Sequence, residues 1–279
     1  MSNDWSAWIH SGDWANEGQA QIPMLPAHVR ELAEMAWEPE VSIRKIAEAV
    51  GKDPVLAMQV IRMSNSAASA SATEIKDIVV AVTRLGTQTV RNVVVAGCLN
   101  AQLVDPKIYG SHGRQIVDHC LGTAILASAL AKRLGTSGEM FLGGLLHDVG
   151  KLLILKLAHD YRLQHPESAP REEVIEIIKS RHAQMGGWLA GRWSMPASLS
   201  DPIVWHHDPE WAEDPLPVAV VYAANRLSHR YGFGCEVDAA GILDDPIMAE
   251  AGITAERLAD LDATAPELYR NTRHVFTSR

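Results

Sequence analysis

The chain has 279 residues, of which 47% are hydrophobic and 21% are charged. This composition indicates a packed core rather than disorder, and the length allows one large domain or two ordinary ones. Asp and Glu outnumber Lys and Arg by 34 to 25, which gives a net charge of −9 with neutral histidine. An acidic balance of this size gives no electrostatic basis for general binding to nucleic acids or anionic membranes.

The cysteines and the N-terminus indicate an intracellular protein. The three cysteines, Cys98, Cys120 and Cys235, are widely spaced without a CxxC pair, so neither a disulfide framework nor a cysteine zinc site is expected. The first residues, MSNDWSAWIHSGDWANEG, contain acids and tryptophans where a secretory signal needs a basic start and an apolar run. No stretch approaches 18 uncharged apolar residues. We therefore expect a cytoplasmic protein without a membrane partner.

The first half of the chain predicts a bundle of short helices. Residues 1–20 are polar, with Trp5, Trp8 and Trp14 at irregular spacing, and they indicate a tail or a strap laid over the body. From residue 25 onward, apolar side chains recur at the spacing of one helix face. The predicted helices cover residues 25–36, 43–50, 54–63, 78–85 and 87–100.

Capping residues mark the ends of these short helices. Ser42, Asp53 and Asp77 stand where N-caps are expected, because their side chains accept the free amide hydrogens of a first helical turn. Gly51 and Gly86 stand where two of the helices should stop.

Residues 42–63, SIRKIAEAVGKDPVLAMQVIRM, contain the helix, glycine turn and second helix of a DNA-binding unit. A recognition helix presents cations and amides to phosphates and base edges, whereas this second helix offers only Gln59 and Arg62. We therefore interpret the segment as two packed core helices and expect no nucleic-acid partner.

The second half predicts longer helices. Residues 103–113 are enriched in Pro, Gly and polar residues, which indicates a connector between two halves. Little of the sequence after residue 113 alternates with period two, so the predicted fold class is all-α. The predicted helices cover residues 115–134, 140–158, 172–179, 182–193, 198–206 and 218–231, and residues 233–279 add two or three short helices, one capped at Thr254.

Polar side chains interrupt the apolar faces of these longer helices. Imidazole and carboxylate groups suit transition metals, and the helices of a bundle can project them to one centre. Adjacent residues on a helix point about 100° apart, so neighbouring ligands would flank one ion or bridge two rather than aim at one point equivalently. Ordinary core histidines without a metal are the alternative. The candidate ligands are His119, His147, Asp148, His182, His206 and His207.

One cation and several glycines accompany this set. Lys151 comes four residues after His147 and shares its helix face, so it would stand beside the site as a cation able to hold a phosphate. Gly143, Gly144 and Gly150 leave little bulk and would permit the close approach of a neighbouring helix.

The motif HDVGK at residues 147–151, with a histidine upstream and HH downstream, resembles the HD superfamily of metal-dependent phosphohydrolases, which includes the HD-GYP domains. Further segments resemble its HDOD branch in the same order over roughly residues 22–230. They are LPAHVRELAEMA, IAEAVGKDPVLAMQVIRMSNSA, AVTRLGTQTVRNVVVAG, HCLGTAILASALAKRLG, FLGGLLHDVGKLLI and HAQMGGWLAGRWSMP. With this resemblance the expected order is an N-terminal tail (1–20), an HDOD bundle of short helices (21–106), an HD-like helical subdomain (107–232) and C-terminal short helices with a tail (233–279).

By this resemblance, the six candidate ligands fall where metal-binding relatives place theirs, and Lys151 falls where cyclic-dinucleotide phosphodiesterases keep a phosphate-contacting lysine. The implied cofactor is a divalent transition metal, Fe, Mn, Zn or Ni, in a mononuclear or dinuclear site. Asn225 departs from the pattern because a closing aspartate is expected there, and an amide is a poorer ligand than a carboxylate. Gln115 replaces a glutamate, and the Gly-Tyr-Pro segment of the cyclic di-guanylate hydrolases is absent after HH.

These residues support two functional hypotheses. An HDOD-type signal-transduction module without catalysis would bind a protein partner or an adjacent signalling domain through its first bundle, exposed tryptophans and tail. A metal-dependent phosphohydrolase or phosphodiesterase would use Asp148 to bridge metals or orient the activated water and Lys151 to hold a small phosphorylated ligand. The nearly complete ligand set favours the enzyme, whereas Asn225, Gln115 and the missing substrate loop favour the regulator.

Overall fold

The computed structural model describes residues 5–15, 35, 41–65, 74–103, 106–135, 140–166 and 168–277. Within these ranges the regular structure is helical and contains no strand, which confirms the predicted all-α class. The chain forms two compact units, one built mainly from residues 24–102 and the other mainly from residues 103–263. No helix in the described ranges combines the length and the apolar character needed to cross a membrane.

The smaller unit contains α3 (Ile43–Gly51), α4 (Pro54–Ser64), α5 (Ile78–Leu85) and α6 (Thr87–Leu103). The predicted N-caps are confirmed: Ser42, Asp53 and Asp77 accept hydrogen bonds from backbone amides three residues later, at 3.3, 3.2 and 2.9 Å. Helices α3, α4 and α5 pack against one another, as expected for core helices. The helix predicted at residues 25–36 lies, apart from residue 35, outside the described residues.

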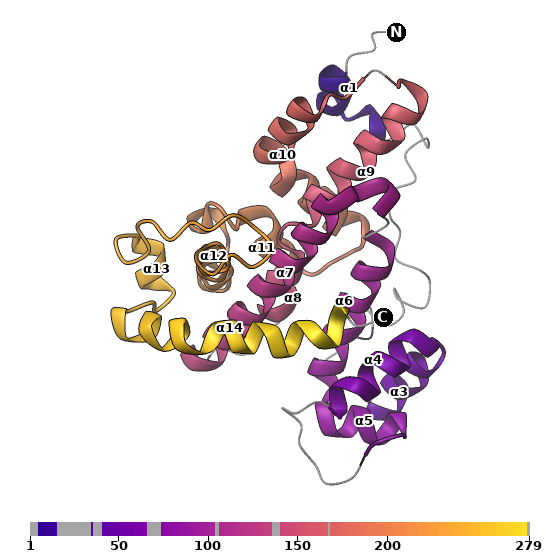
Figure 1. Ribbon diagram of the computed structural model, residues 1–279, viewed down its shortest axis with the longest axis vertical. Helices are drawn as coiled ribbons and strands as arrows, with labels where there is room; N and C mark the ends of the chain where they lie inside the picture. Colours follow the sequence, from indigo (N-terminus) through magenta and orange to yellow (C-terminus); the bar gives the residue numbers. More distant parts are fainter. Residues whose placement is uncertain are drawn as a thin grey trace. The chain divides into compact units, whose positions relative to one another are not determined.

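Helix α7 (Pro106–Leu134) organises the larger unit. It packs against α8 (Met140–Leu146), α9 (Val149–Gln164) and α12 (Pro215–Arg230), and Figure 1 shows α7 and α8 side by side. Helix α10 (Arg171–Arg192) packs on α9, and α11 (Ala197–Trp205) packs on α8 and α10. The short helices η3 (Pro209–Trp211) and α13 (Pro246–Glu250) contact α12. Leu126, Leu146, Leu153, Leu189 and Ile203 are among the fully buried side chains of this unit.

Several predicted boundaries in this unit were wrong. The connector predicted at residues 103–113 is mostly helical, but the backbone of Gly110 is not (φ 56°, ψ −147°), so α7 consists of a short helix and a longer one that meet at a kink. Glycine reaches this left-handed φ without a Cβ clash. The two helices predicted at 172–179 and 182–193 form the continuous α10, because no glycine or proline separates them.

The C-terminal region is more helical than expected. Thr254 caps a helix as predicted, since its Oγ1 accepts a hydrogen bond from the Arg257 amide at 3.2 Å. That helix, α14 (Ala255–Thr277), has 23 residues, where only short helices and a polar end were predicted.

An N-terminal strap covers the larger unit. It comprises α1 (Trp5–Ser11) and η1 (Asp13–Ala15). Trp5 packs edge-on against Tyr161 of α9 at 5.5 Å, and Trp14 against Trp188 of α10 at 4.6 Å. The expected strap is therefore present. The prediction of exposed tryptophans was wrong for Trp5 and Trp14, which are 1% and 6% exposed because they pack on these helices.

Replacing Trp5 with Ala should lower the free energy of unfolding by about 3–5 kcal/mol, because a buried indole is removed from a packed site. Urea denaturation would measure the change. Trp211, which is 70% exposed, is the matched control, and its replacement with Ala should change the free energy by no more than about 0.5 kcal/mol. Equal effects of the two substitutions would contradict a packed strap.

Candidate metal centre

A break between two helices positions His147 and Asp148. The predicted helix 140–158 is divided, because α8 ends at Leu146 and α9 begins at Val149. Asp148 has φ −102° and ψ 11°, outside the regular helical range. Both side chains consequently reach one point, with His147 Nε2 3.3 Å from Asp148 Oδ2. The 100° divergence of neighbouring residues applies to an unbroken helix, and the helix is broken here. That the pair would flank one ion or bridge two stays a prediction.

A second break positions His206 and His207. Helix α11 ends at Trp205, and the two histidines occupy the turn immediately after it. The Nε2 atoms of both reach Nε2 of His182 on α10, at 3.2 Å for His206 and 2.9 Å for His207. As at the first break, the backbone departs from helical geometry at these residues, and two adjacent side chains can therefore approach the same atom.

Glycines bring the helices that carry these residues into direct backbone contact. A Cβ on Gly144 would lie 2.8 Å from the Cα of Ala124 in α7. A Cβ on Gly150 would overlap the carbonyl oxygen of His182 in α10. The predicted close approach is therefore confirmed, and it brings α7, α8, α9 and α10 together at the polar cluster.

Asp148 lies at the centre of this cluster. Its Oδ2 faces Nε2 of His119 at 3.6 Å and of His147 at 3.3 Å. Its Oδ1 faces Nε2 of His182 at 3.4 Å and of His206 at 3.7 Å. All five residues are buried, none being more than 4% exposed. Each carboxylate oxygen thus faces a different pair of imidazoles.

Backbone carbonyls fix the protonation of three of these imidazoles. Because a carbonyl oxygen only accepts hydrogen bonds, each Nδ1 carries a proton, and in a neutral ring Nε2 then holds the lone pair. The Nε2 atoms of His182 and His206 lie 3.2 Å apart, so their lone pairs face each other. This contact is unfavourable unless a cation or a proton lies between the two nitrogens. Such carbonyl contacts also orient metal-binding histidines. The contacts are His147 to Gly144 at 2.7 Å, His182 to Ile178 at 2.7 Å and His206 to Ile203 at 3.0 Å.

Buried polar atoms without hydrogen-bond partners mark the same place. They include both ring nitrogens of His119, Nε2 of His147, Oδ1 of Asp148 and Oδ1 of Asn225. An unsatisfied buried polar group costs about 1–3 kcal/mol, and a bound cation would satisfy several of them at once. Nitrogen and carboxylate oxygen donors fit the expected Fe, Mn, Zn or Ni.

The donors form two groups that match a dinuclear arrangement. One group is His119, His147 and Asp148, and the other is His182, His206 and His207. Within each group the donor atoms lie within 4.8 Å of one another. Because the two oxygens of Asp148 face different imidazole pairs, this carboxylate would be within reach of an ion held by either group.

The electrostatics keep His119, His182 and His206 neutral and the carboxylate ionised. Burial lowers the pKa of His119 to about 3 and that of His182 to about 4, and it also lowers the pKa of His206. Neutral imidazole is the form that binds metals. Burial opposes the charge of Asp148, but His147 and the nearby lysine outweigh it and hold the Asp148 pKa well below its usual value.

Lys151 stands beside the site, and the two residues that depart from the family pattern lie on α12 and α7. Lys151 lies in the first turn of α9 and donates a hydrogen bond to Asp148 Oδ2 at 2.6 Å. Asn225, on α12, is buried. Gln115 is exposed on α7, one turn before His119.

Sequence reasoning missed two residues of ligand type. His229 and Cys235 form a third group with His119. The only sequence signal was that His229 comes four residues after Asn225 and so shares its face of α12. Cys235 gave no signal, because its position beside His119 depends on how the loop after α12 folds.

The comparisons with known proteins agree with this fold. The family model of the HDOD domain matches residues 22–209. The chain belongs to the HDOD family. An HDOD domain protein from Geobacter sulfurreducens superposes on the chain with a TM-score of 0.73 and 23% identity, over 99% of this chain and all of its own. A Shewanella amazonensis protein provisionally named a metal-dependent phosphohydrolase superposes with a TM-score of 0.74 and 18% identity, also over 99% of this chain and all of its own. At these identities, the likeness shows the fold.

The curated relatives of the HDOD chain are longer proteins. An uncharacterized protein of Treponema pallidum is 26% identical over 223 residues, which are 75% of this chain and 42% of that protein. Ribonuclease Y of Thermus thermophilus is 33% identical over 119 residues, which are 42% of this chain and 17% of the enzyme. The HDOD chain therefore spans less than half the length of these relatives.

The metal-free protein should lose stability as the pH falls from about 6.5 to about 4. The unfolded chain protonates its histidines near pH 6.5, whereas His119 and His182 stay neutral in the folded state down to about 3 and 4. Protons therefore favour the unfolded state, by about 1.4 kcal/mol per pH unit for each such histidine. Urea denaturation at several pH values would measure this slope.

The slope should be shallower in His119→Leu and unchanged in His10→Ala, which alters an exposed histidine outside the pocket. A free energy of unfolding that stays flat or rises on acidification would contradict the buried neutral histidines.

Replacing Lys151 with Met should strengthen the binding of a divalent ion roughly tenfold, because it removes a like charge beside Asp148. Competition with a coloured chelator in metal-depleted protein would measure the affinity. Lys156→Met is the matched control, since Lys156 pairs with Asp160 on the same helix, outside the pocket. Weaker binding in Lys151→Met would show instead that the lysine holds the carboxylate in its binding position.

Proposed function

We propose that this HDOD chain is a non-catalytic regulatory module whose HD-like pocket holds one or two divalent transition-metal ions. The observation that carries the proposal is a ligand set that is assembled and, apart from the exposed His207, buried. The proposed ligands are His119, His147, Asp148, His182, His206 and His207. They come from α7, the turn between α8 and α9, α10 and the turn after α11, so an ion here would cross-link four segments of the larger unit.

Closure of the pocket supports regulation over catalysis. A phosphate ester must reach both the ion and a cation that binds its oxygens, yet His119, His147 and Asp148 are at most 4% exposed. Lys151 is already bound to Asp148. Asn225 supplies a neutral amide where the resemblance implies a closing carboxylate. In this arrangement an ion stabilises the packing of the helices and so the shape that a partner would recognise.

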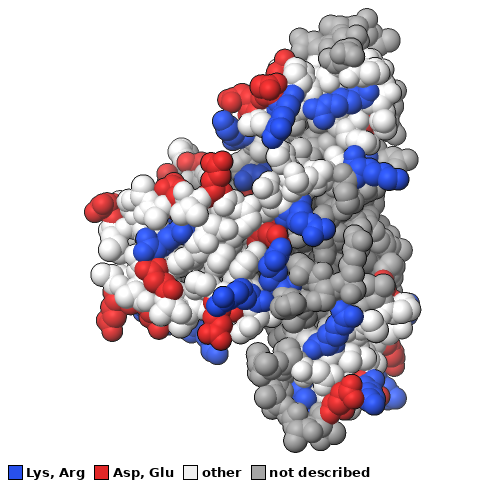
Figure 2. Space-filling view, in the orientation of Figure 1, with Lys and Arg blue, Asp and Glu red and all other residues white. Residues whose placement is uncertain are grey.

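The smaller unit supports a protein partner or an adjacent signalling domain. Apolar side chains are exposed on its helices: Ile43 on α3 is 37% exposed, Met58 on α4 is 56%, and Val79 and Val80 on α5 are 42% and 49%. Exposed apolar surface is typical of protein interaction sites. The net charge of −9 argues against nucleic acid. On the face shown in Figure 2, acidic and basic side chains are interspersed, and neither sign covers the face continuously.

A metal-dependent phosphohydrolase is the second candidate, and two observations favour it. Lys151 stands beside the ligand set, and His207 is exposed at its edge. A bound ion would supply an activated water molecule. Lys151 would then exchange its contact with Asp148 for a phosphate oxygen, and Asp148 would orient the reacting groups.

Metal analysis of untagged protein tests the proposed site. We expect transition metal at about one or two ions per chain, because the donor set is preformed. The His147→Ala, Asp148→Ala double variant should lose it, whereas His159→Ala, a histidine on α9 outside the cluster, should keep it. Metal below about a tenth of an ion per chain in the parent protein, even after incubation with Fe²⁺, Mn²⁺, Zn²⁺ and Ni²⁺, would overturn the site.

Hydrolysis assays of the metal-loaded protein separate the two functions. Assays of a general phosphodiester and several cyclic nucleotides should show no turnover above that of the double variant. Turnover that disappears in both the double variant and Lys151→Met would overturn the regulatory proposal in favour of the phosphohydrolase.

A further inference from the structure

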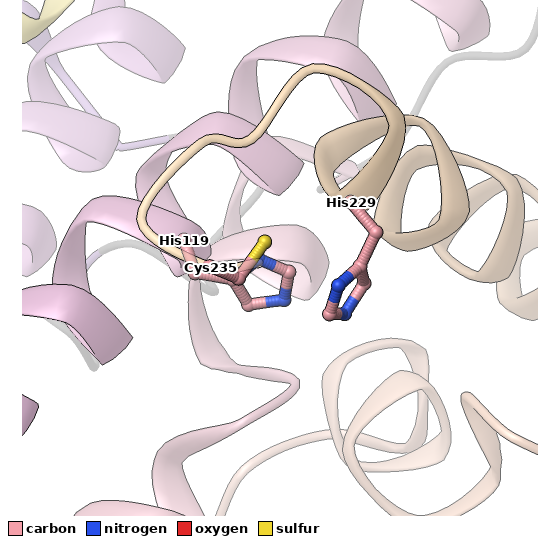
Figure 3. A group of neighbouring side chains, drawn as sticks. All are labelled: His119, His229 and Cys235. Carbon is pink, nitrogen blue, oxygen red and sulfur yellow. The ribbon is translucent and has the colours of Figure 1, made fainter. Parts of the chain in front are cut away.

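A third group of ligand-type side chains shares only His119 with the pocket around Asp148. Its members are His119, His229 and Cys235, and their donor atoms all lie within 4.8 Å of one another. Figure 3 shows the three side chains turned toward one another. His119 comes from α7, His229 from the last turn of α12 and Cys235 from the loop after α12.

Backbone contacts build the loop that carries Cys235. The amide of Gly232 donates to the His229 carbonyl at 3.1 Å, and that of Phe233 donates to the Ser228 carbonyl at 3.0 Å. These bonds turn the chain back after α12. The Cys235 thiol then lies 3.8 Å from the same Ser228 carbonyl.

Two glycines seat this loop directly on α7. Gly234 has φ +70°, and a Cβ there would overlap the backbone nitrogen of His119. A Cβ on Gly122 would lie 2.6 Å from Cβ of Phe233, a side chain that is only 6% exposed. The Ser228 hydroxyl adds a contact to the His119 carbonyl at 3.5 Å. Cys235 is therefore held beside His119 by close packing.

His119 supplies an independent indication of a ligand. It is 4% exposed, and neither of its ring nitrogens has a hydrogen-bond partner. Its ring centroid lies 4.8 Å from that of His229. Nε2 faces Asp148 at 3.6 Å. When Nε2 also binds an ion of the pocket, His119 reaches a second ion by releasing its remaining N–H proton to solvent, so that the ring bridges the two ions as an imidazolate.

We propose that His119, His229 and Cys235 bind a further divalent ion of borderline softness, such as Zn²⁺ or Co²⁺. Two imidazoles and a thiolate form a donor set typical of such ions, with a water molecule in the fourth position. Donor atoms around a tetrahedral ion stand about 3.3–3.6 Å apart, which small side-chain rotations reach from the observed spacing. The metal–sulfur bond forms as the thiol releases its proton to solvent. This site extends the proposed function and shares only His119 with it.

Titration of the metal-depleted full chain with Co²⁺ tests this site, because a cysteine–cobalt bond gives a sulfur-to-metal charge-transfer absorption in the near ultraviolet. The parent protein should develop that absorption. Cys235→Ser should lose it, and His229→Gln should weaken the Co²⁺ affinity read from it by roughly tenfold or more. Cys120→Ala, which removes a buried cysteine adjacent to His119, is the matched control and should retain it. Circular dichroism would check that each variant folds.

Asp148→Asn separates this site from the pocket, because it damages a ligand set that contains no sulfur. The sulfur absorption should persist in Asp148→Asn. Absence of the absorption in the parent protein at saturating Co²⁺, its survival in Cys235→Ser or its loss in Cys120→Ala would each overturn the site. Metal that depends on Asp148 but gives no sulfur absorption would overturn only this inference. Sulfur absorption without any metal that depends on Asp148 would overturn only the pocket proposal.

Discussion

The buried carboxylate of Asp148 imposes the arrangement of its neighbours. An isolated ionised carboxylate in a protein interior costs several kcal/mol, even after the surroundings relax. Here Lys151 offsets part of that cost at 2.6 Å, and imidazoles surround both oxygens. These groups come from α7, the turn between α8 and α9, α9 itself, α10 and the turn after α11, so one charge specifies where five segments of the larger unit must meet. The glycines at 144 and 150 make that meeting sterically feasible.

The same charge gives the pocket two alternative partners. In the structure the ammonium group of Lys151 is the nearest cation to the carboxylate. Under the proposed function, an ion would compete with Lys151 for Oδ2 while satisfying the lone pairs of His147 and His182. Metal binding would then replace the Lys151 ammonium group, which comes from α9 alone, with an ion that contacts several helices. The metal-bound state would therefore have the same fold as the metal-free state but a more stable arrangement of these helices.

Local signals in the sequence predicted the helix ends well, because a cap acts within four residues of itself. Ser42 and Asp77 illustrate this. The break at residues 147–148 could not be predicted in this way, since apolar residues at helical spacing run through it on both sides. Its cause is tertiary, because the backbone turns to deliver both side chains to one buried point. The candidate ligands could be named from the sequence, because polar side chains interrupt apolar helix faces and the resemblance to HD proteins implies the same six residues. Their distances from one another came only from the structure. Cys235 was unpredictable because its neighbour His119 lies more than a hundred residues away in sequence.

The tryptophan strap links the N-terminus to the two helices that carry much of the pocket. Trp5 contacts α9, which contains Lys151, and Trp14 contacts α10, which contains His182. The indole rings consequently sit where any change in the angle between α9 and α10 must alter their packing. Their intrinsic fluorescence would therefore change if α9 moved relative to α10, without any attached dye.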